Sequence, residues 1–298
     1  MPSAAGEFTS ETALRTLQVA CAAAGLDDRG AQLLRLGTNA NYKLEAHPIM
    51  ARIAPGRIED VRKEIDVARW LARSGFPAAR LVDGIEQPLI LGGRAVTFWE
   101  LIEPSPDPVH LADVARLLCD LHRLPEPAGF ALPRFEPLAH SIRRLDGVVD
   151  GEDARFLRSR CERLQEQFDG LEFVLPPGVI HGDAHEGNAL RDRLGCVRLL
   201  DFESVALGPR EWDLGVLALR YRPFGWISEA EYRACVTAYG GFDVTEWPGF
   251  RVLQGIRELS MTTWLLRKAG ESPEHGAEFR KRMADLRDDS APRHWRAF

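Results

Sequence analysis

A short polar run between apolar segments constrains this chain more than any other feature. Residues 181–188 read His-Gly-Asp-Ala-His-Glu-Gly-Asn, and they directly follow the apolar pair Val179-Ile180. A second apolar stretch, residues 197–200, ends in Asp201-Phe202-Glu203. Both apolar segments are too short for helices, so we expect short strands that present the polar run as a loop and bring Asp201 to its side.

The residue types and their spacing indicate phosphoryl transfer. Kinase catalytic loops follow the pattern H-x-D-x-x-x-x-N with a second aspartate downstream, and both parts are present in His181, Asp183, Asn188 and Asp201. This chemistry requires an alcohol in line with the γ-phosphorus and magnesium to neutralise oxygen charge. We therefore expect Asp183 to accept the hydroxyl proton, and Asn188 and Asp201 to bind Mg2+ through hard oxygens. Turn and capping roles fit Asp183 alone better than they fit the whole set.

A metal-dependent hydrolase is the competing interpretation of the same loop. His181, Asp183 and His185 stand at alternate positions and offer nitrogen and oxygen ligands. Of the eight histidines, the six outside the loop form no H-x-x-x-H pair, so a dinuclear site is poorly supplied. We expect His185 to order the loop and His122 to be a satisfied core histidine.

Composition narrows the classes of partner. The chain has 298 residues, of which 45% are hydrophobic and 28% charged, as in soluble globular proteins of one large or two modest domains. A net charge of −6 gives no basic field, so we expect no nucleic-acid partner. No apolar stretch approaches the ~18 residues of a membrane span, and the simplest prediction is a cytoplasmic protein without a membrane partner. The oligomeric state stays open.

Hydrophobic periodicity divides the chain near residue 102. Before it, the pattern predicts helices over residues 10–24 and 57–74, and antiparallel strands at residues 33–36, 42–45, 48–54, 88–91 and 94–101. Prolines at 104, 106 and 108 then interrupt the chain, and we place a domain boundary between residues 1–102 and 103–298. Glu64 falls on the inward stripe of its helix, so this carboxylate requires a cationic partner.

The second part is mainly helical. The pattern predicts helices over residues 109–124, 137–146, 153–171, 211–220, 229–239 and 254–269, and short strands at 179–180, 189–190 and 197–200. The fold class is therefore α+β, with a small antiparallel sheet followed by a mainly helical region.

These motifs resemble the aminoglycoside phosphotransferase and choline kinase family from about residue 33 to residue 219. The H-G-D-x-H-x-G-N loop of that family is matched at residues 181–188, its I-D-[WF]-E strand end at residues 200–203, and its following glycine-proline segment at residues 208–215. The resemblance implies a two-lobed protein-kinase-like fold, with a nucleotide-binding lobe before the catalytic and acceptor-binding lobe. It also implies transfer from ATP or GTP, with Mg2+, to a hydroxyl of a small acceptor.

The resemblance assigns roles in the first lobe. Arg52 takes the place of the strand cation and pairs with Glu64, although the protein-kinase pattern has lysine there. The bend at residues 37–41 becomes a phosphate lid with Thr38, Asn39 and Asn41. The linker at residues 98–102 resembles the family's hinge, whose purine-binding positions fall on the backbone of Glu100 and Ile102 and whose depth-limiting residue is Trp99.

Further roles fall in the second lobe. Asp213 is expected to cap the helix that follows and to brace the catalytic loop, which His181 and His185 also support. The acceptor is expected between the catalytic loop and two stretches, residues 146–153 and 254–274.

The acceptor is the least constrained part of the prediction. The first stretch has acids without a base, including Asp146 and Asp150, and the second has Arg257, Glu258 and Trp264 on a helix. Acids attract amines, which favours an antibiotic-like acceptor that contains amines and hence a resistance role. A solvated acidic loop is the blander interpretation. A nucleoside antibiotic, or a sugar or amino alcohol of primary metabolism, stays open.

Overall fold

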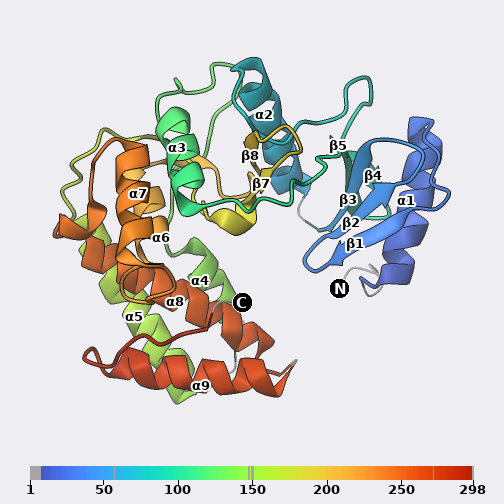
Figure 1. Ribbon diagram of the computed structural model, residues 1–298. Coiled ribbons are helices and arrows are strands. Elements are labelled where there is room, and N and C mark those ends of the chain that lie inside the picture. The colour runs from blue at the N-terminus through green and yellow to red at the C-terminus, as the bar shows by residue number, and fades with distance from the viewer. Residues whose placement is uncertain (1–7, 57, 147, 149–150, 271, 297–298) are drawn as a thin grey trace. The chain divides into compact units, whose positions relative to one another are not determined.

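The structure is a computed structural model that describes residues 8–56, 58–146, 148, 151–270 and 272–296 (Figure 1). The chain groups into two compact units. One, here called the sheet unit, comprises residues up to Val109 with Pro127–Leu132 and Glu186–Val205. The other, the helical unit, comprises His110–Glu126, Pro133–His185 and the residues from Ala206 onward. The lobe boundary at residue 102 stays a prediction.

The sheet unit is built on a five-stranded antiparallel sheet in the order β1-β2-β3-β5-β4. Its strands are β1 (Gln32–Leu36), β2 (Ala40–Leu44), β3 (Ile49–Pro55), β4 (Leu89–Leu91) and β5 (Arg94–Glu100). Successive side chains of a strand point to opposite faces of the sheet. Alternate residues of β2 and β3 are accordingly buried, so one face of the sheet is more deeply buried than the other. The predicted antiparallel sheet is thus confirmed.

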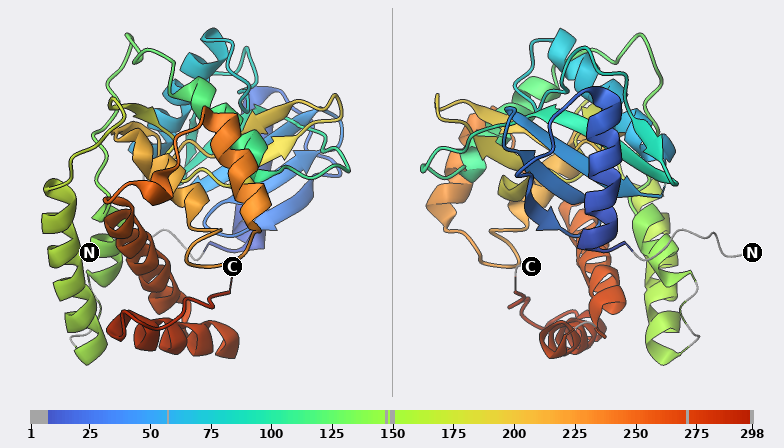
Figure 2. Two further views of the ribbon diagram at one scale, coloured as in Figure 1. Left: turned by 60° about the vertical axis from the view of Figure 1, so that its left-hand side comes forward. Right: turned by 90° about the vertical axis from the view of Figure 1, so that its right-hand side faces the viewer.

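Two helices bury side chains from opposite faces of this sheet. Helix α1 (Ser10–Ala24) shares one apolar cluster with Ile53 and Val96, whereas α2 (Ile58–Arg73) shares another with the neighbouring residues Ala54 and Ala95. Successive strand residues point to opposite faces, so the two clusters lie on different sides of the sheet. Figure 2 shows α1 lying across its face.

The sheet unit also holds the hairpin that follows the polar loop. The short helix Glu186–Asn188 leads into β7 (Ala189–Arg191), which pairs with β8 (Val197–Leu199). Strand β8 is attached to the rest of the unit through backbone hydrogen bonds, from Ala79 N to Leu199 O at 2.9 Å and from Leu199 N to Pro77 O at 3.0 Å. These bonds fix where β8 ends, and Asp201 follows directly.

The helical unit contains seven described α-helices and a two-stranded ribbon of β6 (Gly178–Ile180) and β9 (Ala206–Gly208). The helices are α3 (Leu111–Leu121), α4 (Ala139–Leu145), α5 (Glu152–Asp169), α6 (Arg210–Ala218), α7 (Glu229–Tyr239), α8 (Phe250–Lys268) and α9 (Pro273–Arg287). Helix α3 packs on α7, and α8 packs on α4, α5 and α9. The α+β class is confirmed, and no described helix is long and apolar enough to cross a membrane.

Three features of the helical unit differ from the sequence prediction. Helix α8 begins at Phe250, earlier than the expected residue 254, because Phe250 and Leu253 are buried in the core and continue its inward face. Helix α9 and strand β9 were not predicted. The apolar residues of α9 are diluted by charges, and only the spacing of Phe279, Met283 and Leu286 marks its buried stripe.

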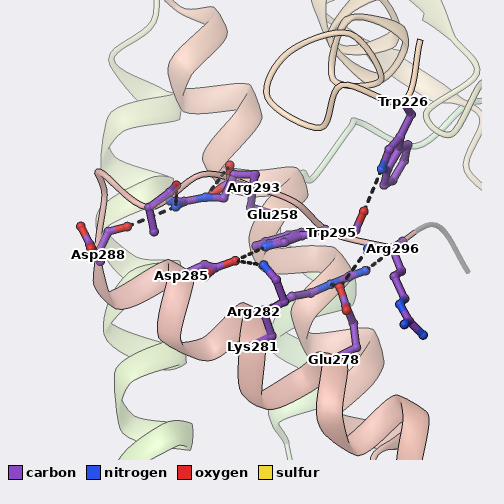
Figure 3. Close-up of polar contacts among 11 residues, drawn as sticks. Trp226, Glu258, Glu278, Lys281, Arg282, Asp285, Asp288, Arg293, Trp295 and Arg296 are labelled. Atoms are coloured by element: carbon purple, nitrogen blue, oxygen red, sulfur yellow. Dashed lines mark hydrogen bonds and ion pairs between the residues drawn. The ribbon is translucent and has the colours of Figure 1, made fainter.

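A buried polar cluster joins α8, α9 and the segment after α9 (Figure 3). We call it the tail cluster, and it consists of Glu258, Glu278, Arg282, Arg293 and Trp295. Arg282 Nε lies 2.9 Å from Glu278 Oε1, and Arg293 Nε lies 3.3 Å from Glu258 Oε1. The Arg282 guanidinium also lies 4.7 Å from the centre of the Trp295 ring. Each charge that this region buries therefore has a partner of opposite sign.

Candidate active site

The backbone of the polar loop is held by Asp213 in the helical unit. This carboxylate is fully buried, and it accepts from His181 N at 2.7 Å and from Gly182 N at 2.8 Å, one bond to each oxygen. Trp212 Nε1 donates to Gly182 O at 2.8 Å. Gly182 has φ of 83°, in the left-handed region that favours glycine. The loop is thereby fixed directly before Asp183.

Asp213 braces the loop as expected, but the expectation that it caps a helix is wrong. The N-cap of α6 is Pro209, and Asp213 lies inside the first turn. Its carboxylate is directed to the loop and to His122, whose Nε2 lies 3.0 Å from Asp213 Oδ2. The other nitrogen of the His122 ring lies 2.8 Å from the Tyr239 hydroxyl. His122 is 2% exposed, which confirms that it is a satisfied core histidine.

Asp183 carries its own set of cationic neighbours. Arg257 of α8 donates from Nη2 to Asp183 Oδ1 at 3.0 Å, and His185 Nε2 lies 3.9 Å from the other oxygen. Burial would raise the pKa of Asp183, but the charges of Arg257, His185 and His181 outweigh it and hold the pKa below its usual range. Asp183 is therefore ionised at neutral pH, as a general base must be.

His181 does not have the geometry that the hydrolase interpretation requires. Its ring is fully buried, and Nδ1 accepts from the backbone N–H of Asp183 at 3.3 Å. Within the described part of the chain, no three histidine, cysteine, aspartate or glutamate side chains gather as metal ligands. The ring of His181 thus supports the loop backbone.

The predicted Arg52–Glu64 ion pair is present in the sheet unit. Arg52 Nη1 lies 3.2 Å from Glu64 Oε1, and Glu64 is 6% exposed. With the Asn39 amide oxygen turned toward the guanidinium, it accepts from Arg52 Nη2 at 2.6 Å and from Nε at 2.9 Å. Burial raises the pKa of Glu64 to about 7, against the opposing effect of Arg52 and with help from Asp201 and Glu203. The pair links strand β3 to helix α2.

The polar face of the sheet continues beyond Arg52. Asn41 was expected in the bend but lies in β2, directly opposite Arg52 in the strand register. The Oδ1 atom of Asn41 is buried and has no hydrogen-bond partner among the described residues. Thr38, in the bend itself, is exposed. An unsatisfied buried oxygen beside a guanidinium suits a ligand that donates hydrogen bonds or brings a cation.

The two predicted metal ligands lie on neighbouring backbone segments. Leu200 N donates to Asn188 O at 2.9 Å, which brings the residue before Asp201 alongside Asn188. Asp201 has φ of 61°, and no other described residue except glycine has a positive φ. Such strained conformations concentrate at functional sites. One carboxylate and one neutral amide oxygen are hard ligands, so this donor set fits Mg2+.

Some hydrogen-bonding groups of the predicted hinge already have partners within the sheet unit. Trp99 is 4% exposed, and its indole N–H donates to Thr97 Oγ1 at 2.8 Å. The N–H of Glu100 donates to Arg80 O at 2.8 Å, so a purine contact at this residue is limited to its carbonyl. Glu100 and Ile102 both line a cavity of about 330 Å³ in the sheet unit.

Comparison with known proteins decides the family. The profile described as "Phosphotransferase enzyme family" matches residues 31–253, which is most of the chain. The chain belongs to this family. Kinases of this family use a nucleoside triphosphate and a divalent metal, and the protein is accordingly a phosphotransferase that acts on a hydroxyl acceptor.

Solved structures similar to this phosphotransferase share its fold. Amicoumacin kinase hAmiN, solved with AMP-PNP, Ca2+ and Ami, has a TM-score of 0.73 at 15% identity, over 96% of this chain and 97% of that chain. A choline/ethanolamine kinase family protein from Mesorhizobium loti has a TM-score of 0.64 at 19% identity, over 94% and 96%. The aminoglycoside phosphotransferase APH(3'')-Id from Streptomyces rimosus has 0.60 at 18%, over 84% and 99%. The resemblance seen in the sequence is confirmed.

The residues expected to contact the acceptor of this phosphotransferase have varied surroundings. Glu258 is 1% exposed and belongs to the tail cluster, so its carboxylate supports the fold. Trp264 is half-buried, packs edge-on against His275 and has Lys268 Nζ 5.3 Å from its ring centre. Asp146 is exposed at the end of α4, whereas Asp150 lies outside the described residues.

Two acids of the stretch at residues 146–153 are paired with an arginine from elsewhere in the chain of this phosphotransferase. Arg287 of α9 places Nη2 2.7 Å from Asp153 Oδ1 and 3.7 Å from Glu152 Oε1. A cationic side chain of another helix therefore neutralises part of the negative charge of this stretch. Arg144 was not predicted, because no motif marks it, and neither was the contact between Arg257 and Asp183.

Proposed function

We propose that this chain transfers the γ-phosphoryl group of ATP or GTP to a hydroxyl of an antibiotic or a related small metabolite. Asp183 is the general base, and Asn188 and Asp201 hold Mg2+. The observation that carries the proposal is the loop that Asp213 fixes, in which Asp183 is kept ionised by Arg257 and His185.

The chain's own residues divide the work. Asp183 accepts the proton of the acceptor hydroxyl as its oxygen bonds to the γ-phosphorus and the bond to the nucleoside diphosphate breaks. Arg52, oriented by Glu64 and Asn39, binds the donor phosphates. Mg2+, when bound by Asn188 and Asp201, supplies charge neutralisation at the phosphate oxygens. The backbone of Ile102 and the carbonyl of Glu100 contact the purine.

The biological setting belongs to the same proposal. Solved structures of this fold include a kinase in complex with Ami and a choline/ethanolamine kinase family protein. Inactivation of an antibiotic in the cytoplasm is the role that we test first. Phosphorylation of a sugar or an amino alcohol in metabolism is the second.

The test is a coupled nucleotide-consumption screen with ATP and GTP run separately against hydroxyl acceptors of different classes. Asp183→Asn should lower turnover of any confirmed acceptor by about 10² to 10⁴ while nucleotide affinity stays unchanged. Asp120→Asn, at an exposed aspartate in the same unit, is the matched control and should keep full activity. Full turnover by Asp183→Asn would remove Asp183 as the base. Stoichiometric zinc, with activity that requires no nucleotide, would favour the hydrolase.

A further inference from the structure

Positive charge gathers around Asp183 in the helical unit. Arg257 of α8 and Arg144 of α4 are both part-buried, and α4 packs directly on α8. Asp183 is the acidic side chain that both arginines have in common: Arg257 bonds it, and its charge acts on Arg144. Arg257 thus hydrogen-bonds this carboxylate, whereas Arg144 only feels its charge and is hydrogen-bonded to Ser260.

Arg257 is only partly satisfied by Asp183. Its Nη2 donates to Asp183 Oδ1 at 3.0 Å, and its guanidinium lies 5.9 Å from the centre of the Trp212 ring. The Nε atom is buried and has no hydrogen-bond partner in the described part of the chain. A buried donor on a charged group without an acceptor is costly, because the group has given up its water.

Arg144 reaches the same turn of α8. Its Nη1 donates to Ser260 O at 3.0 Å and lies 3.3 Å from Ser260 Oγ. Ser260 is three residues after Arg257, so both lie on one face of the helix. Burial and repulsion from Arg257, Arg143 and Arg267 lower the pKa of Arg144, and Asp183 opposes that shift. Among the described residues, Arg144 thus hydrogen-bonds neutral oxygens of Ser260 and no carboxylate.

Three acids of the helical unit have cationic partners of their own. Glu258 follows Arg257 in the chain, but its carboxylate is paired with Arg293 in the tail cluster. Glu152 and Asp153 are paired with Arg287. Among the described residues of the helical unit, Asp183 is thus the one carboxylate hydrogen-bonded to either arginine, and two guanidiniums beside one carboxylate disfavour a cationic acceptor.

We propose that Arg144 and Arg257 bind an anionic group of the acceptor, a carboxylate or a phosphate, and so bring its hydroxyl to Asp183. Guanidinium groups bind both kinds of anion through paired hydrogen bonds, and Arg257 has its buried Nε to offer. The inference rests on the proposed kinase function. It replaces the amine-bearing acceptor favoured by the sequence with an anionic one.

Binding of charge-matched probes tests the inference without turnover. The full chain is first saturated with Mg2+ and a non-hydrolysable ATP analogue, so that anions cannot occupy the nucleotide site. Gluconate, glucose 6-phosphate, glucose and glucosamine are then titrated by calorimetry. We expect gluconate or glucose 6-phosphate to bind at least about tenfold more tightly than glucose and glucosamine, which is the effect of one charged hydrogen bond. The two anionic probes distinguish carboxylate from phosphate recognition.

Variants then assign the binding to this site. Arg144→Gln should weaken the anionic probe at least about tenfold and leave glucose unchanged. Arg144→Lys, which keeps the charge, should lose less, and Arg123→Gln, at an exposed arginine of the same unit, should lose nothing. Equal or tighter binding of glucosamine, absence of binding by both anions, or an unchanged affinity in a folded Arg144→Gln would each overturn the inference. Turnover of an amine acceptor that depends on Asp183 would overturn it while leaving the kinase proposal intact.

Discussion

Arg257 and Asp183 form a hydrogen-bonded ion pair in the helical unit, with 3.0 Å between Nη2 of the arginine and Oδ1 of the aspartate. The pair joins the proposed base to helix α8, far along the chain. It therefore connects the protonation of Asp183 with the packing of a helix that carries no catalytic motif.

Replacing Arg257 should change the pH dependence of catalysis. Arg257 favours the ionised form of Asp183, so Arg257→Gln raises the pKa of that carboxyl. Because the base acts only when ionised, the acidic limb of kcat/KM should move to higher pH. The position of the limb is compared, since the absolute rate also reflects acceptor binding. A limb that stays in place, or moves to lower pH, would show that Arg257 does not act on the base.

Removing the Asp213 carboxylate that holds the loop should strongly lower the free energy of unfolding. Asp213 uses both oxygens to accept backbone N–H groups, and Asn at this position offers only one acceptor oxygen. Asp213→Asn therefore leaves a buried N–H unpaired and loses the charge that faces His122. We expect a loss of roughly 3 kcal/mol in the free energy of unfolding, measured in urea, together with a lower kcat. Asp120→Asn is the matched control, and a change below about 0.5 kcal/mol would contradict the role of Asp213.

The buried Glu64 should make stability depend on pH. The pKa of Glu64 is raised to about 7 in the folded chain, from an ordinary value of 4.5. Its contribution to stability is fully present below pH 4.5, where the group is protonated in both states, and is lost as pH rises through about 7. Glu64→Gln cannot ionise, so its stability relative to wild type should rise across this window, by up to about 1.4 kcal/mol per pH unit. A difference that is constant with pH would contradict the burial of this charge.

The tail cluster offers a double-mutant test. Arg282 is 2% exposed and pairs with Glu278, so Arg282→Met leaves a buried carboxylate without its cation. This should cost about 3–5 kcal/mol in the free energy of unfolding. The double variant with Glu278→Leu removes both charges and should recover much of that loss, because the pair itself contributes little net stability. Equal losses in the single and double variants would show that packing of Arg282, and not its charge, stabilises the region.

Local signals account for the parts of the fold that the sequence predicts well. Helices α1 and α7 begin and end where expected, because Thr9 and Ser228 cap their first turns and Gly25 and Gly240 follow their last residues. Helix α9 was missed because two of its six buried residues are charged. Glu278 and Arg282 are buried only as a pair, and hydrophobic periodicity does not register such a pair.

In the candidate site, too, features set by local spacing were predictable and features set by tertiary packing were not. Asp183, Asn188 and Asp201 could be predicted as a set because their spacing is local. The Arg52–Glu64 pair was expected from the inward position of Glu64 and from the resemblance. The contacts of Arg257 with Asp183, and of Arg144 with Ser260, join residues that are 74 and 116 positions apart. The first contact depends on the position of the loop beside α8 and the second on the packing of α4 on α8, and no motif in the sequence marks either arginine.

The tail cluster should also influence the order in which the helices of the helical unit pack during synthesis. The ribosome makes Glu258 before Arg293, so a growing chain that ends between them has the α8 carboxylate without its partner. Burying the Glu258 carboxylate without a cation would cost about 3–5 kcal/mol. We therefore expect α8 to reach its final packing only after Arg293 has been made. Folding from the N-terminal side as the chain emerges is the usual course for domains. We therefore expect α8, whose Arg257 contacts the base, to be among the last helices to dock, with its apolar side accessible to chaperones until then.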